Sequence, residues 1–295
     1  MDNSLLIALT ALLGLVVGSF ANVVIYRLPR IIEQEWKAEL DAYLEEQGIT
    51  PPPATTAAAA TESEAEAKPE SKRQSLPLSL SLPRSHCPHC QTPIRYRDLI
   101  PVLSWLFRRG RCAHCHGSIS VRYPVVELIS AALAVIAWQQ VEALLLALAI
   151  YGFSMTLVVG ALIDWDSKWL PDRITLPLMW SGLFLASIGQ NPLGLSLSHA
   201  LWGAMAGYLT FWLMATVFRL VTGRDGLGGG DTKLLAALGA WLGGLVLPQL
   251  LLMSSLLGLG IALWFRLRHG KQGEFPFGPA LAASGLILFW HPLPL

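Results

Sequence analysis

The sequence predicts an all-α polytopic membrane protein with about eight transmembrane helices and a small cytoplasmic zinc-ribbon-like module. The chain has 295 residues, of which 53% are hydrophobic and only 14% charged, so it is too apolar for an ordinary soluble domain. Long apolar runs recur along it, and the charges are concentrated in the polar stretches between them. Four cysteines form two CxxC pairs in one polar stretch. The net charge of +1 gives no reason to expect nucleic acid as a partner.

The first predicted span covers residues 4–26, within a first domain of residues 1–26. It is long enough to cross a lipid bilayer and lacks the basic start of a cleavable signal peptide. Arg27 and Arg30 follow and are expected to end it. Asn22 lies inside this apolar segment, so it either forms an interhelical hydrogen bond or belongs to a functional site.

Residues 27–122 form a polar cytoplasmic loop with three predicted parts. Residues 33–47 are typical of an acidic amphipathic helix. A disordered insert is expected at about 50–75, because Pro, Ala, Thr, Ser and Glu dominate there without an apolar period. The cysteine module occupies about 84–118.

The two CxxC pairs are separated by 21 residues. This spacing predicts a tetrahedral, structural Zn²⁺ site with four thiolate ligands. Spare reduced thiols or a redox pair are the alternatives, and a cytoplasmic location disfavours structural disulfides. The predicted ligands are Cys87, Cys90, Cys112 and Cys115.

Seven further spans are predicted within a membrane core of residues 123–295. They are 123–140, 143–163, 174–190, 199–220, 232–247, 249–265 and 276–291. The weakest boundary is the one marked only by Pro248. With eight spans, all 21 Lys and Arg residues fall on or next to one side of the membrane. The positive-inside rule makes that side cytoplasmic and places both termini outside.

Two acidic clusters lie at this cytoplasmic boundary. One contains Asp164, Asp166 and Asp172, and the other is Asp231 at the end of a glycine-rich segment. Two carboxyl groups at one depth, with no histidine ligands beside them, suggest an acid/base pair that activates water against a peptide carbonyl. Asp164 is favoured as the partner of Asp231. Helix capping is the alternative for Asp172 and Asp231, and a pair with Lys168 for Asp166.

Several motifs in the same order resemble the type IV prepilin peptidases, a family of GxGD membrane aspartic proteases. Gly228 and Gly230 are the glycines of the GxGD pattern. Gly229 stands at the variable position, where the family often has a larger residue. The motifs are GSFANVVIYRLP at 18–29, the two CxxC pairs, RYPVVEL at 122–128, ALIDWDSKWLPDRITLPLMW at 161–180, GRDGLGGGDTKLLAALGAWLG at 223–243 and FPFGPALA at 275–282.

The resemblance covers nearly the whole chain and implies catalytic acids at Asp164 and Asp231. It also implies a bacterial inner-membrane enzyme that cleaves the leader of type IV prepilins or type II secretion pseudopilins. Many members of the family then methylate the new N-terminal residue with S-adenosyl-L-methionine. The substrate has a basic leader in the cytoplasm and an apolar helix in the membrane. Its scissile bond would therefore lie at the depth of the two acids.

Glu127 lies about one turn inside the span that begins at Tyr123. An intramembrane acid is a functional candidate, and with Asn22 it is a candidate for methyl transfer. The alternative is a hydrogen bond from Glu127 to Asn22 or Ser19. Three other functions stay open: a peptidase without methyltransferase activity, a non-enzymatic assembly factor for a pilus or secretion machine, and a transporter with a proton relay.

Overall fold

The computed structural model describes residues 3–49, 78–141, 143–224, 226, 228–269 and 276–291. The insert expected at about 50–75 lies outside these residues. The described part of the chain contains helices and two isolated β-bridges but no strand. The helices are α1 (Asn3–Glu46), η1 (Tyr96–Leu99), α2 (Leu103–Phe107), α3 (Arg122–Gln140), α4 (Leu144–Ser167), α5 (Asp172–Ser187), α6 (Leu197–Thr222), α7 (Gly229–Leu242), η2 (Gly244–Val246), α8 (Leu247–His269) and α9 (Gly278–Trp290).

Each of the eight predicted spans corresponds to a helix of the structure. Within the described residues, four helical segments are long and apolar enough to cross a membrane. They are 3–46, 144–167, 197–222 and 244–268. Helices α5, α7 and α9 have 16, 14 and 13 residues. At 1.5 Å per residue they reach about 20–24 Å, which is less than the ~30 Å of bilayer hydrocarbon.

Helix α1 continues well beyond the predicted end of the first span. It is a single helix of 44 residues, about 66 Å long, with Pro29 in its interior. Buried apolar residues, including Ile25 and Ile32, continue one face across this region and pack in a cluster with Ile163 and Ile174. The predicted amphipathic helix at 33–47 is therefore the second half of α1. We call residues 27–46 the α1 arm.

Glycines allow the closest helix contacts in the bundle. A Cβ added to Gly18 would lie 2.7 Å from Cα of Glu127, so α1 and α3 approach at backbone distance. Between α6 and α7 the approach is closer, since a Cβ on Gly203 would lie 2.1 Å from the carbonyl oxygen of Gly239. Small residues permit such contacts between membrane helices. These pairs set the spacing on which the candidate site depends.

Helix α7 lies in the centre of the C-terminal part of the bundle. Each residue from Leu234 to Leu242 is buried, and Trp241 donates its indole N–H to the carbonyl oxygen of Leu178 on α5 at 2.7 Å. Because protein covers α7 on all sides, a helix too short to span the bilayer is stable there. It ends at Gly243, which has φ of 84°, whereas Pro248 lies in the first turn of α8. The predicted break at Pro248 was therefore placed a few residues too late.

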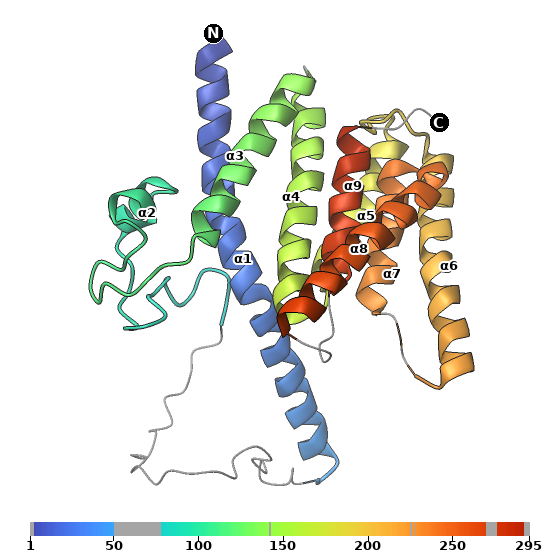
Figure 1. Cartoon of the computed structure of the whole chain (residues 1–295), viewed down its shortest axis with the longest axis horizontal. Coiled ribbons are helices and arrows are strands. Elements are labelled where there is room, and N and C mark those ends of the chain that lie inside the picture. Colours follow the sequence, from blue (N-terminus) through green and yellow to red (C-terminus); the bar gives the residue numbers. More distant parts are fainter. Residues whose placement is uncertain are drawn as a thin grey trace.

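Figure 1 shows that α1 begins and α9 ends at the same end of the bundle. The C-terminal end of α4 and the N-terminal ends of α7 and α9 lie toward the opposite end. The cysteine module, with α2, lies beside α1 and α3. The two acidic clusters, which are distant in sequence, are thus brought to one end of the molecule.

Candidate active site

The first acidic residue, Asp164, lies in the last turn of α4. Only 4% of its surface is exposed. The helix ends just beyond it at Lys168, a left-handed residue that donates its backbone N–H to the carbonyl oxygen of Asp164 at 2.8 Å. Gly278, at the start of α9, donates its backbone N–H to Oδ2 of the same residue at 2.9 Å. Hydrogen bonds therefore hold both the backbone carbonyl and the side-chain carboxyl group of Asp164.

The second acidic residue, Asp231, lies half-buried in the first turn of α7. The alternative interpretation of Asp231 as a helix cap is wrong, because Gly228 is the N-cap residue. A Cβ on Gly230 would lie 2.9 Å from Cβ and the carbonyl oxygen of Leu170, so only glycine lets this turn approach the α4–α5 loop. A Cβ on Gly229 would meet nothing within 4 Å, so the larger residue common in the family would also fit. Asp231 and Asp164 interact electrostatically in this arrangement.

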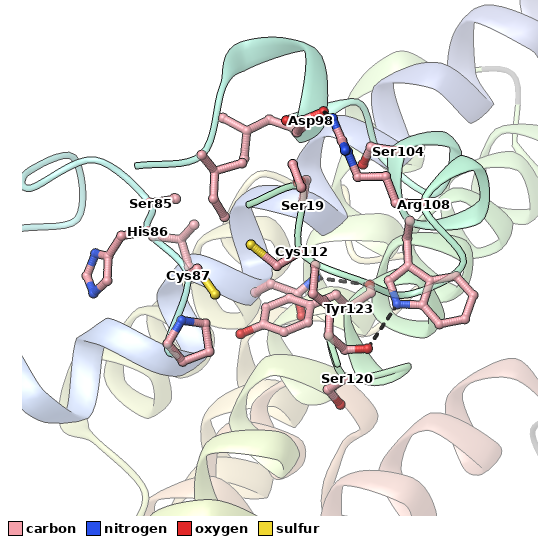
Figure 2. A pocket seen from close by; sticks show the side chains of 18 of the residues that line it. Ser19, Ser85, His86, Cys87, Asp98, Ser104, Arg108, Cys112, Ser120 and Tyr123 are labelled. Carbon is pink, nitrogen blue, oxygen red and sulfur yellow. Dashed lines mark hydrogen bonds and ion pairs between the residues drawn. The ribbon is translucent and has the colours of Figure 1, made fainter. Parts of the chain in front are cut away.

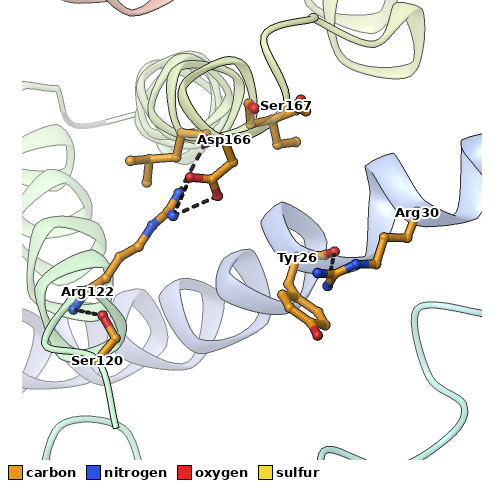
Figure 3. Close-up of polar contacts among 8 residues, drawn as sticks. Tyr26, Arg30, Ser120, Arg122, Asp166 and Ser167 are labelled. Carbon is orange, nitrogen blue, oxygen red and sulfur yellow. Dashed lines mark hydrogen bonds and ion pairs between the residues drawn. The ribbon is translucent and has the colours of Figure 1, made fainter. Parts of the chain in front are cut away.

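The other two acids of the first cluster are held by cations. Asp166 accepts two hydrogen bonds from Nη1 of Arg122, at 2.8 and 2.7 Å, instead of pairing with Lys168 (Figure 3). Nη2 of Arg122 reaches the carbonyl oxygen of Leu162 at 3.1 Å. Asp172 is the first residue of α5 rather than its cap, and its oxygens lie 2.5 and 2.6 Å from Nζ of Lys233. These pairs tie α3 to α4 and α5 to α7 around the two candidate acids.

The α1 arm packs against the same loop from outside the bundle. The rings of Trp36 and Trp169 have centroids 5.3 Å apart. Nη2 of Arg173 lies 2.6 Å from Oε2 of Glu35. Since both pairs are partly exposed, the ion pair contributes little by itself, and ring contact with burial of Ile32 supplies most of the attachment.

The four cysteines form two knuckles with the same backbone pattern. The first Cys of each, Cys87 and Cys112, donates its N–H to the residue five positions on and accepts from the residue four positions on. In both knuckles that second partner has a positive φ, of 57° at Gln91 and 56° at His116. One isolated bridge closes each turn, as expected for a zinc-ribbon-like module.

The ligand atoms of all four cysteines lie within 4.8 Å of one another, and Sγ of Cys87 lies 3.8 Å from Sγ of Cys115. A tetrahedral ion with metal–sulfur bonds of ~2.3 Å requires sulfurs about 3.8 Å apart. Hydrogen bonds with Thr92 lower the pKa of the Cys90 thiol to about 6, and backbone bonds with Cys115 and His114 lower the pKa of Cys112. The thiolate form that binds a metal is thus favoured at these two positions.

A cavity of about 700 Å³ lies between the end of the first span, the cysteine module and the start of α3 (Figure 2). Asn22 and Glu127 both line it. Asn22 donates from Nδ2 to the carbonyl oxygens of Gly18 and Tyr123, at 3.2 and 3.1 Å, which is the interhelical bond that one interpretation predicted. Glu127 accepts the N–H of Val102 at 2.7 Å, and the Ser19 hydroxyl also bonds to it.

The arrangement supplies two neighbouring carboxyl groups at one end of the bundle and a separate cavity with a buried carboxylate. The first can share a proton and activate water, and the second can receive a small molecule. Sequence reasoning missed Gly278, although its motif was recognised. Its Gly-Pro pair at a helix start is a signal that could have located the α9 terminus beside Asp164. It also missed Arg27, which was interpreted only as the end of a span.

Comparison with known proteins gives consistent matches over both halves of the chain. The family model described as the bacterial peptidase A24 N-terminal domain matches residues 12–141, and that of the type IV leader peptidase family matches residues 151–263. No solved structure gives a significant match.

Three similar proteins carry the name prepilin leader peptidase/N-methyltransferase. That of Aeromonas hydrophila is 43% identical over 295 residues, covering 96% of this chain and 90% of the relative. That of Neisseria gonorrhoeae is 40% identical over 294 residues, with coverage of 96% and 90%. That of Dickeya chrysanthemi is 45% identical over 279 residues, covering 93% and 88%.

Proposed function

We propose, since this chain belongs to the type IV leader peptidase family as its motifs predicted, that it is a membrane aspartic endopeptidase and N-methyltransferase. Its substrates would be type IV prepilins or type II secretion pseudopilins. The observation that carries the peptidase assignment is the pair formed by Asp164 and Asp231. Asp164 is buried and oriented by Gly278, and it interacts electrostatically with Asp231 at the start of α7.

In the proposed cleavage, Asp164 and Asp231 share one proton and hold a water molecule between them. The ionised carboxylate takes a proton from this water, whose oxygen attacks the scissile carbonyl carbon. The protonated carboxyl group gives its proton to the substrate, and the leaving amine departs as the C–N bond breaks. One carboxyl group cannot perform both proton transfers, so both acids are required.

The proposed topology has eight membrane-crossing segments, with both termini periplasmic and the cysteine module cytoplasmic. Support comes from the clustering of lysines and arginines at the end of the bundle that carries Asp164 and Asp231. In a bacterial inner membrane, this end faces the basic leader of the substrate. The division into residues 1–26, 27–122 and 123–295 follows from the same topology, with α1 running through the first boundary.

For methylation, the amine released by cleavage must first lose its extra proton, and Glu127 is the proposed acceptor. The nitrogen lone pair then forms a bond to the methyl carbon of S-adenosylmethionine. The donor, when bound, would supply the methyl group and leave as a neutral thioether that keeps the electron pair of the broken carbon–sulfur bond. The proton taken by Glu127 passes on to water, so the carboxylate is restored.

We assign Zn²⁺ to the four-cysteine site. Four sulfur donors in a compact tetrahedral spacing fit this ion, and a closed four-thiolate site is structural. The residues that would hold it are Cys87, Cys90, Cys112 and Cys115. Bound there, the ion would join the two knuckles and so stabilise the module against α1 and α3.

The proposed function is tested with the purified full-length protein in lipid, given a prepilin and a labelled methyl donor. Mass spectrometry should show loss of a short leader and one added methyl group on the new N-terminus. Cleavage without methylation would reduce the assignment to a peptidase. Binding without cleavage would favour a non-enzymatic assembly factor and overturn the proposal.

A further inference from the structure

The cavity in Figure 2 has the dimensions of a small-molecule site. Its volume of about 700 Å³ falls within the range of about 300–1,000 Å³ that is common for ligand pockets. Residues of α1, the cysteine module and α3 line it. Figure 2 shows Ser19 of α1, Cys87 and Cys112 of the module and Tyr123 of α3 among these residues. The cavity is therefore formed only when the module is docked on the membrane helices.

One wall of this cavity carries the buried carboxylate of Glu127, for which the described residues provide no cationic partner. Only 7% of the surface of Glu127 is exposed. Its bonding partners are neutral: the N–H of Val102 and the hydroxyl of Ser19. None of the ion pairs found among the described residues includes it. A carboxylate offers about four acceptor positions, so capacity for a ligand remains.

A second lining residue, Arg27, carries the opposite charge, and it too has no ionic partner in the part of the chain that the structure describes. Arg27 is 6% exposed. Its guanidinium group donates to the carbonyl oxygens of Ser79, Leu80 and Pro83, at 2.9, 3.4 and 2.6 Å. Five N–H donors are available to an arginine, so two remain beyond these three bonds. No ion pair found in the described chain includes Arg27.

Buried charges are costly unless an opposite charge accompanies them. The Asp98 and Arg108 side chains, which also line the cavity, already pair with each other. Arg27 and Glu127 pair neither with them nor with one another. A ligand that brings both a carboxylate and a cationic centre would neutralise both residues at once.

We propose that this cavity binds the methyl donor S-adenosylmethionine, with its carboxylate at Arg27 and its sulfonium and ammonium groups at Glu127. This assignment rests on the proposed function, which supplies the need for a donor. Arginine binds carboxylates through paired N–H groups, and a carboxylate stabilises a nearby sulfonium. The aromatic side chains of Tyr123 and Trp105 in the lining offer faces for the adenine ring.

The test measures affinities of the purified full-length protein in lipid nanodiscs for three ligands. They are S-adenosylmethionine, S-adenosylhomocysteine, which lacks the sulfonium charge, and decarboxylated S-adenosylmethionine. Glu127→Gln keeps an acceptor for Val102 but removes the charge. It should weaken the binding of S-adenosylmethionine about tenfold or more, and the binding of S-adenosylhomocysteine much less. Arg27→Gln should weaken the binding of S-adenosylmethionine about tenfold or more and leave the affinity for its decarboxylated form unchanged.

Matched controls are Glu39→Gln and Arg97→Gln, which remove exposed charges outside the cavity lining. A purely structural role for Arg27 or Glu127 would weaken all three ligands equally, and this uniform loss would overturn the proposal. A variant that does not fold is recognised by lost metal and lost leader cleavage. In that case the wild-type protein is crosslinked to a photoreactive adenosyl donor, and the labelled residues are identified by mass spectrometry. Labels on the cavity lining support the proposal, and labels elsewhere reject it.

The same measurements separate this inference from the proposed function. If the wild-type protein methylates a pre-cleaved pilin but the two cavity variants keep its ligand affinities, only the cavity assignment is wrong. If the wild-type protein neither binds the donor nor methylates, the transferase part of the proposed function is wrong as well.

Discussion

Gly278 and Asp164 lie 114 positions apart, yet the backbone N–H of Gly278 is 2.9 Å from Oδ2 of Asp164. A Cβ at position 278 would lie 2.6 Å from the same oxygen. The glycine therefore has two roles: it donates a hydrogen bond to one carboxylate oxygen, and it leaves room for that carboxylate beside α9. A backbone donor cannot rotate away as a side chain can, so Asp164 is held in one orientation.

The first prediction is that Gly278→Ala lowers the rate of leader cleavage about 10- to 100-fold. Displacing the carboxylate forfeits a charge-assisted hydrogen bond, which contributes about 1.5–3 kcal/mol. Cleavage is measured with purified protein and a prepilin at saturating concentration. Gly260→Ala on α8 is the control, because a Cβ there meets nothing within 4 Å. Equal rates for the two variants would show that Asp164 needs no such orientation.

The second prediction is that Asp164→Asn and Asp231→Asn each reduce cleavage at least ~10²-fold, while the protein still inserts into the membrane. Loss of a general acid or base has effects of about 10²–10⁴-fold. Asp166→Asn and Asp172→Asn should be milder, because each of these exposed acids pairs with a cation at the edge of the site. An inactive Asp166→Asn protein beside an active Asp164→Asn protein would show that the wrong acid of the cluster was chosen.

The third prediction is one zinc ion per chain, measured by elemental analysis of protein purified under reducing conditions. Cys112→Ser should lower the metal content and make the module more sensitive to proteolysis, because the metal holds the two knuckles together. Leader cleavage should persist in a chelator that inactivates metalloproteases. Absence of zinc from the reduced protein would contradict the assignment of the four thiols.

The fourth prediction separates the two activities. Asp231→Asn should still transfer a labelled methyl group to a pilin that has already lost its leader, whereas Glu127→Gln should transfer much less. The reason is that the proton acceptor proposed for methylation lies on α3, away from α7. Failure of Asp231→Asn to methylate a pre-cleaved pilin that it binds would mean that the sites are not separable.

The sequence was sufficient to predict the placement of the two acids at one end of the bundle. The distribution of lysines and arginines predicts which side of the membrane each loop lies on. The same topology places Asp164 and Asp231 at one boundary. The cysteine module was predictable for a similar reason, since its spacing is local and its geometry is confirmed. Features that are set by local spacing or by the bilayer can be predicted without knowledge of the tertiary contacts.

The contacts between distant segments were not predictable. Gly278 donates to Asp164 from 114 residues away, and no periodicity connects the two. Asp166 likewise pairs with the distant Arg122 on α3, although Lys168 is nearer in sequence. Helix α1 also continues past Pro29, because Ile32 packs with residues of α4 and α5. Tertiary packing decided each of these three outcomes.

Because α1 is uninterrupted, its two halves cannot rotate independently about the helix axis. Each residue of an α-helix turns the following part by 100°, since 3.6 residues complete one turn. One alanine inserted after Pro29 would keep the arm helical yet turn Trp36 away from Trp169. Seven inserted residues would return it to within about 20° of its original direction, but displaced along the axis by about 10 Å. The register of the arm against the α4–α5 loop is thus set by the glycine contacts of α1 with α3 inside the bundle, and torsion at one end of this helix is felt at the other.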